Sequence, residues 1–161
     1  MRRLVCLAVA LTFVFALGSS IIGGPALADS HTEAPSLYKR LGGYDALAAA
    51  TDDFIGRMAA DPQLGKFFAG HSKESLQRIR QLVVDQLCAA TGGPCVYIGR
   101  DMKSSHQGMG ITEADWNRAV GHLVATLDKF KVPEKEKNEF LALASSLKND
   151  IVDQTPAAAK P

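Results

Sequence analysis

The strongest structural signal in the sequence is an amphipathic pattern over residues 73–91. Apolar residues recur there at steps of three and four, as Leu76, Ile79, Val83, Leu87 and Ala90. Residues at these steps share one face of an α-helix, because the helix completes a turn about every 3.6 residues. The pattern predicts a long helix with one apolar face, ended by Gly92-Gly93-Pro94.

Three other stretches carry similar patterns, and no stretch alternates with a period of two for long enough to form a strand. We expect substantial helices over 44–60, 73–91, 112–131 and 134–152, with short helical pieces at 37–41 and 64–68. The hydrophobic content of 47% is enough for one domain with a core. The sequence therefore predicts an all-α fold in which the four long helices form two consecutive pairs.

His106 stands between the two predicted pairs, in a segment with room for about one turn of helix. Met102 lies one turn before it on the same face, and Gly108 and Gly110 follow closely. Imidazole is the commonest protein ligand for metals, haem iron included. This context favours a histidine presented into a pocket, although a lone histidine is more often a surface or fully hydrogen-bonded residue.

The first 28 residues have the pattern of a secretory signal peptide. Arg2 and Arg3 precede an apolar run over residues 4–17, and Ala26-Leu27-Ala28 offers small residues for cleavage. The run falls short of the roughly 20 residues that span a bilayer. We expect cleavage after Ala28, a periplasmic or secreted protein without a membrane anchor, and a domain over 36–152 between a disordered linker (29–35) and a disordered tail (153–161). The formal net charge of +1 gives no reason to expect a nucleic-acid partner.

Cleavage would remove Cys6 and leave Cys88 and Cys95. In an oxidising compartment such a pair favours a disulfide, which here would tie the end of the 73–91 helix to the following loop. Two free thiols are the alternative. A zinc site made of both cysteines with His71 and His106 lacks the usual paired spacing.

Several short motifs, in their order and spacing, resemble the group I truncated haemoglobins from about residue 36 to 152. They are Leu41-Gly42-Gly43, Asp53-Phe54, Phe67-Phe68-Ala69-Gly70, Thr91-Gly92-Gly93-Pro94, Tyr97 with Gly99, Met102-Lys103, His106-Gln107-Gly108, Gly110-Ile111-Thr112 and Gly121-His122-Leu123. The resemblance implies a two-over-two helical sandwich that encloses haem b and binds O2, NO or CO at the iron.

The resemblance assigns roles to particular residues. His106 corresponds to the proximal ligand of the iron, and Phe68 to a phenylalanine that packs on the porphyrin. Other pocket-lining positions are occupied by Phe54, Tyr97, Met102, Ile111 and Trp116, the last where the family more often has phenylalanine. Simple core packing is the alternative for each apolar position.

The chain departs from the family at the distal positions. Ile55 stands where oxygen-stabilising members carry tyrosine. When the helix is aligned on Gly92-Gly93, Ile79 and Val83 occupy the positions of the usual glutamines, and Leu82 that of a histidine found in hexacoordinate members. The resemblance then implies an apolar distal pocket, which disfavours oxygen more than CO or NO because oxygen gains most from a donor.

The alignment of this helix is open, because about three residues are inserted between Phe68 and Gly92. Placing the insertion elsewhere could bring Arg80 or Gln81 to the distal side. The apolar pattern argues against it, since a buried arginine would need a partner. His71 could in principle be a sixth ligand, but we expect it to be a solvated loop residue.

Two classes of function follow. The first is an exported haem globin that binds diatomic gases, with NO dioxygenation or another redox role and an unidentified redox partner as possibilities. The second is a globin-derived helical interaction module that has lost haem. A third class, a haem peroxidase, needs a titratable side chain on the distal side to act as acid and base, and the sequence places no such residue there.

Overall fold

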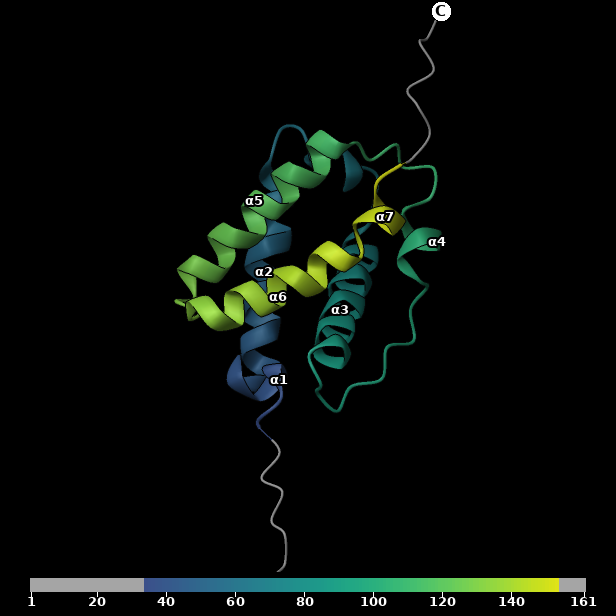
Figure 1. The fold of residues 1–161 in the computed structure, drawn as a ribbon. Helices are drawn as coiled ribbons and strands as arrows, with labels where there is room; N and C mark the ends of the chain where they lie inside the picture. Colours follow the sequence, from purple (N-terminus) through teal and green to yellow (C-terminus); the bar gives the residue numbers. More distant parts are fainter. Residues whose placement is uncertain (1–33, 154–161) are drawn as a thin grey trace, which may run out of the picture. The chain divides into compact units, whose positions relative to one another are not determined.

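A computed structural model describes residues 34–153, so the predicted signal peptide and most of the predicted linker and tail lie outside the described residues. All the regular elements of the described part are helices, and it contains no strand, which confirms the all-α prediction (Figure 1). Its elements are α1 (Leu37–Arg40), α2 (Gly43–Ala60), the 3-10 helix η1 (Gly65–Phe67), α3 (Lys73–Ala90), α4 (Met102–His106), α5 (Glu113–Lys129), α6 (Glu134–Ser146) and α7 (Lys148–Ile151).

Helix α2 is the central element of the domain. It packs against α3, α5, α1 and η1, while α6 packs against α1. The hydrophobic core joins these helices through Leu37 of α1, Leu47 of α2, Cys88 of α3, Leu127 of α5 and Phe140 of α6. The first predicted pair, α2 with α3, is therefore a direct packing pair, and α5 packs mainly on α2.

Helix ends follow the local sequence closely. Thr112 and Asp115 form a capping box at the start of α5, in which the Thr112 side chain and the Asp115 side chain each bond to the other residue's backbone amide. Ser72 caps α3 through its hydroxyl, which accepts a hydrogen bond from the Ser75 amide at 3.2 Å. The last helix was expected to be continuous over 134–152, but it breaks at Leu147, whose amide turns to the Ala144 carbonyl at 3.1 Å. This tighter turn separates α6 from α7.

The apolar pattern of α3 is only partly a core pattern. The fully buried residues of α3 are Val84 and Cys88, each 0% exposed, whereas Ala90 is exposed. Ile79 and Val83 lie beside this buried face and are half-buried. Similarly, the apolar pattern of the 112–131 stretch includes Phe130, but this side chain is 40% exposed at the end of α5.

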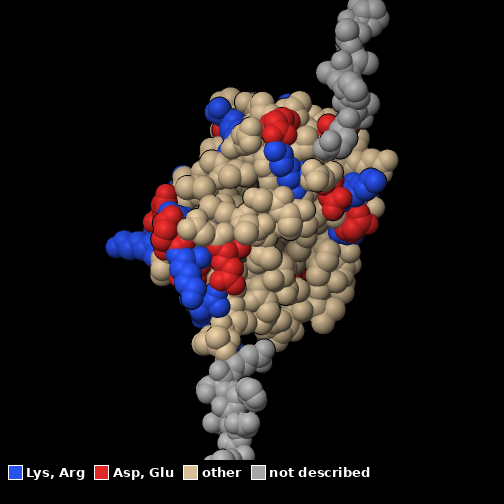
Figure 2. All heavy atoms as spheres, viewed as in Figure 1, with Lys and Arg blue, Asp and Glu red and all other residues tan. Residues whose placement is uncertain are grey.

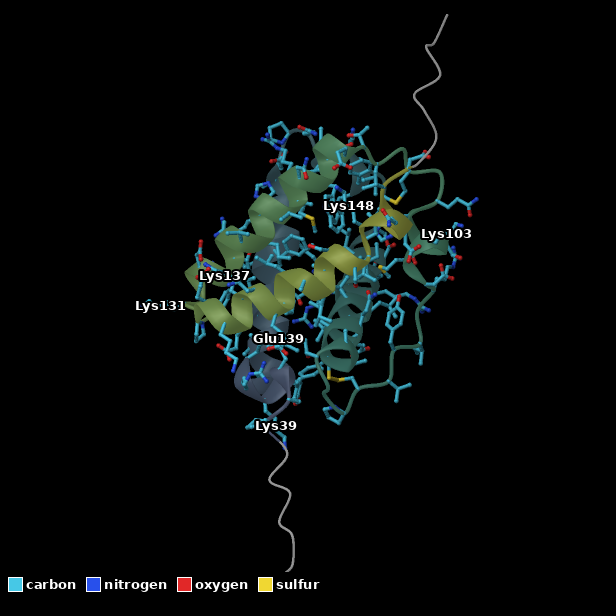
Figure 3. All side chains as sticks on the ribbon, in the orientation of Figure 1. Lys39, Lys103, Lys131, Lys137, Glu139 and Lys148 are labelled. Carbon is cyan, nitrogen blue, oxygen red and sulfur yellow. A yellow bond between two sulfur atoms is a disulfide. The ribbon has the colours of Figure 1, made fainter. Side chains whose placement is uncertain are left out.

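Charged side chains gather at the junction of α5 and α6, at the left of the view in Figure 2. Lys137 bridges Asp128 and Glu134 there, at 2.8 Å from each. Lys131, the one non-glycine residue of the described part with a positive φ, projects from the same corner (Figure 3). Within the described residues, every helix is too short or too polar to cross a membrane.

Candidate functional site

Helix α4 presents His106 on a single capped turn. Asp101 caps it, because its carboxylate accepts hydrogen bonds from the Ser104 amide at 2.7 Å and the Ser104 hydroxyl at 2.9 Å. These bonds, the amide first, hold the pKa of Asp101 below its usual value. Lys103 projects into solvent from the same turn (Figure 3). The chain thus holds His106 at the end of a short helix that packs against α7.

The ring of His106 is oriented by its own helix. Its Nδ1 lies 2.8 Å from the carbonyl oxygen of Met102. Because a carbonyl can only accept, Nδ1 carries the hydrogen, and the lone pair of the neutral ring is on Nε2. In metal-bound histidines, the ring nitrogen that does not bind the metal commonly donates its hydrogen to a backbone carbonyl, a carboxylate or water.

The predicted pocket residues come from elements on several sides of the domain. Apart from Ile111, which is 8% exposed, all of them are half-buried. They are Phe54 and Ile55 of α2, Phe68 after η1, Ile79 and Val83 of α3, Tyr97 of the 91–101 connection, Met102 and His106 of α4, Ile111 before α5 and Trp116 of α5. The domain therefore carries a set of large apolar side chains that its own atoms cover only in part.

The polar residues of α3 fix which way that helix faces. Arg80 donates to both carboxylate oxygens of Asp52 on α2, at 2.7 and 2.9 Å. Gln81 donates to the hydroxyl of Tyr44, also on α2, at 2.7 Å. Both candidate distal donors of the alternative alignment are thus engaged with α2. This arrangement supports the alignment on Gly92-Gly93.

Gln86 is a residue that the sequence analysis did not consider. It follows Ile79 by seven residues and so lies only about 20° from it around the helix. Its side chain is half-buried, and we find no hydrogen bond from it to another residue of 34–153. The spacing alone could have placed it on this face. The face of α3 that carries Ile79 and Val83 therefore includes one polar side chain, the carboxamide of Gln86.

Tyr97 is fixed by two neighbours in the chain. Its hydroxyl donates to the Arg100 carbonyl at 2.5 Å. Its ring covers Gly99, where a Cβ would lie 2.6 Å from Tyr97 Cε2, so only glycine fits. Burial, and then the charge of Asp101, raise the pKa of the Tyr97 hydroxyl. The side chain therefore acts as a neutral, oriented aromatic group.

Asp61 organises the turn that leads to Phe68. This buried carboxylate accepts hydrogen bonds from Arg118 at 2.6 Å, His122 at 2.7 Å and the amide of Gln63 at 2.8 Å. Burial alone would raise the pKa of Asp61, but the bonds from His122 and Arg118 outweigh it and lower the pKa. His122 thus has a structural role, which its sequence position did not reveal.

The remaining candidates lie apart from this set. His71 is exposed, with Nδ1 3.0 Å from the Ser75 hydroxyl. Cys88 and Cys95 form the predicted disulfide, so neither sulfur is available to zinc. A cavity of about 490 Å³ lies between α1, α6 and the end of α3, lined by residues such as Leu37, Ala90 and Leu143, and includes none of the predicted pocket residues.

Comparison with known proteins gives consistent matches over the whole described domain. The family model of the bacterial-like globins matches residues 36–153. The group 1 truncated haemoglobin GlbN of Mycolicibacterium paratuberculosis is 37% identical over 119 residues, covering 74% of this chain and 85% of the relative.

Solved structures agree. The truncated haemoglobin of Tetrahymena pyriformis in its Fe(III) form superposes with a TM-score of 0.69 at 26% identity, covering 74% of this chain and all of that one. The 2/2 haemoglobin of Synechococcus, solved in the cyanomet state with covalently attached haem, superposes with a TM-score of 0.67 at 28% identity, covering 73% of this chain and 98% of that one.

Proposed function

Because the chain belongs to the bacterial-like globin family, as a group 1 truncated haemoglobin, we propose that it holds haem through His106 and binds a diatomic gas there. Haem iron is the cofactor of this family, and the iron supplies the position at which O2, CO or NO binds. The residues of this chain fit that cofactor. The observation that carries the proposal is the orientation of His106, whose Nδ1 faces the Met102 carbonyl and whose Nε2 is thereby left as the donor nitrogen.

The apolar side chains around α4 support the same proposal. A porphyrin is a large flat apolar group, and half-buried aromatic and aliphatic residues such as Phe54, Phe68 and Trp116 are suited to pack on it. Exposed cations near the proximal helix, Arg100 and Lys103, suit the carboxylates of haem. Neither cation forms an ion pair within the described residues.

The competing function is a helical interaction module that has lost haem. It gives no reason for the tautomer of His106 to be fixed, nor for Gly99 to make room for the Tyr97 ring. Half-buried apolar residues suit either function, because an interaction module also presents an apolar surface to its partner. The fixed tautomer of His106 and the glycine at position 99 therefore favour the haem protein.

The test is the visible spectrum of the mature protein, residues 29–161, produced with haem supplied. We expect a Soret band that shifts with CO after reduction and that His106→Ala removes or strongly alters. His71→Ala is the matched control, because His71 is exposed, and it should leave the band unchanged. A folded helical protein without stoichiometric haem would refute haem binding and leave the interaction module as the remaining function.

We also propose that the distal side is apolar and disfavours oxygen relative to CO. Ile55, Ile79 and Val83 carry no hydrogen-bond donor, and a buried donor to a polar ligand is worth about 1 kcal/mol or more. Oxygen should therefore dissociate rapidly, and Ile55→Tyr should slow its dissociation by about fivefold or more. If the protein releases oxygen slowly and Gln86→Leu makes it fast, the pocket is polar through Gln86 and this part of the proposal fails.

Export is proposed from residues 1–28, which lie outside the described residues. The charged start, apolar run and Ala26-Leu27-Ala28 support cleavage after Ala28 and a periplasmic or secreted location. The disulfide of the mature domain suits an oxidising compartment. Mass spectrometry of the protein from the periplasm should find Asp29 as the first residue, and an intact N-terminus in the cytosol would refute export.

A further inference from the structure

The disulfide joins the core of the domain to the segment that carries the proximal helix. Cys88, at the end of α3, is fully buried and belongs to the central core cluster with Leu47 and Leu127. Cys95 is half-buried, packs against this cluster and lies in the 91–101 connection. The bond therefore fixes the start of an irregular segment to the buried end of α3.

That segment has few other attachments. Near the start of the 91–101 connection, the Gly93 amide donates to the Cys88 carbonyl at 2.8 Å. The hydrogen bonds that follow Cys95 in the chain, such as that from the Tyr97 hydroxyl to the Arg100 carbonyl, join residues close in sequence. Within 34–153, we find no hydrogen bond from residues 94–100 to α2, α3, α5 or α6. Val96 is 76% exposed and Ile98 is 80% exposed, so these side chains contribute little packing.

The segment leads directly to α4. It runs from the end of α3 along the outside of the domain to the helix that bears His106 (Figure 1). Among the other helices, α4 packs mainly against α7. Helix α7 is itself only a single turn. The position of His106 therefore depends on a short helix held at one side by α7 and at the other by the 91–101 connection.

We propose that the Cys88–Cys95 disulfide is a redox latch that controls how firmly the chain retains haem. This inference rests on the proposed function, because it concerns the proximal side of the same site. With the disulfide formed, the connection is pinned and α4 keeps His106 in place. With the disulfide reduced, residues 94–106 gain mobility and haem dissociates faster.

The chemistry requires a dithiol reductant. One of its thiolates attacks the half-buried Cys95 sulfur, the bond between the two cysteine sulfurs breaks, and Cys88 leaves as a thiolate that takes a proton. The second thiol of the reductant then displaces Cys95 and becomes part of a cyclic disulfide. Two electrons and two protons pass to the protein, and two thiols result. Because Cys88 is fully buried, the leaving thiolate is disfavoured and reduction should be slow.

The experiment compares haem transfer from the haem-loaded protein to an excess of apomyoglobin, with and without dithiothreitol. We expect reduction to accelerate haem transfer by about tenfold. Cys95→Ser should transfer haem at the fast rate under both conditions, which separates the disulfide from any other effect of the reductant. Equal rates for oxidised and reduced wild-type protein would overturn the proposal.

Amide hydrogen exchange supplies a second readout that does not depend on haem. Reduction should increase exchange in residues 94–106 by a larger factor than in α5, in the protein with or without haem. If the protein binds no haem, the proposed function fails, and the exchange pattern still tests the latch. Unchanged exchange over 94–106 after verified reduction would refute it.

Discussion

Replacing Asp115 by asparagine should destabilise the domain by about 2 kcal/mol at neutral pH. Asp115 is buried at the start of α5, where its carboxylate accepts hydrogen bonds from Gln63 at 2.7 Å, from the Thr112 hydroxyl at 2.7 Å and from the Thr112 amide at 3.0 Å. Burial opposes ionisation, but the bonds from Gln63 and Thr112 and the charge of Lys66 lower the pKa of Asp115 from 3.8 to about 2.

The magnitude follows from this difference. A group whose pKa is lower in the folded state contributes stability that is complete above its unfolded pKa and is lost as the pH falls through the folded pKa. The contribution of Asp115 to the free energy of unfolding should thus be constant from pH 7 to 5 and about half as large near pH 3. It should disappear only when the pH falls below the folded pKa. In Asp115→Asn, a side-chain amide group would also face the donors of Gln63 or Thr112.

Urea unfolding followed by circular dichroism at several pH values measures this effect. Thermal unfolding at pH 7 provides a second measurement, in which the melting temperature of Asp115→Asn should be lower than that of the wild type by about 8 °C. Asp52→Asn is the control, because the Asp52 side chain is 58% exposed and its pair with Arg80 should contribute less than about 1 kcal/mol. If Asp115→Asn costs no more than this control, or if its cost does not shrink below pH 4, the reasoning is wrong.

Three further predictions concern stability. Gly99→Ala should cost about 1–3 kcal/mol in urea unfolding, because the added methyl group displaces the Tyr97 ring; Gly56→Ala, with open space around its Cβ position inside α2, should instead stabilise by about 0.5–1 kcal/mol. The double variant Cys88→Ala/Cys95→Ala should lose about 2.4 kcal/mol relative to the oxidised protein, since the disulfide closes a short loop. A dithiol reductant should lower the stability of the wild type and leave that variant unchanged, whereas a reductant effect on both would assign the loss to something else.

The sequence predicts the helices well because their signals are local. Ser72 and the Thr112 box define helix starts from hydroxyl groups that reach amides of the next turn, and Gly92 ends α3 with a φ of 81°. The break at Leu147 has no such signal, because helix-forming residues continue across it. It depends on how α7 packs against α4 and α6, which is tertiary information.

The sequence alone points to the proposed ligand of the candidate site, but not to the groups that hold that ligand in place. His106 follows from spacing and resemblance, but the carbonyl of Met102 that fixes its tautomer is a backbone group that no motif identifies. Asp61 reads as a helix stop before proline, and its role in holding His122 across 61 residues emerges only from the fold. Long-range polar contacts leave no periodic trace in a sequence, so a single sequence does not reveal them.

The two sides of the proposed haem site are held by different physical means, and this difference separates the effects of mutations. The proposed distal residues sit on α2 and α3, long helices that are joined by the Arg80–Asp52 pair and share the core. Changes such as Ile55→Tyr therefore act on a rigid frame and should alter ligand kinetics while haem stays bound. The proximal His106 sits on one turn of helix reached through an irregular segment, so loss of Cys95 should alter haem retention more than ligand selectivity. A Cys95→Ser variant that kept its haem but changed the ratio of oxygen to CO affinity would contradict this division.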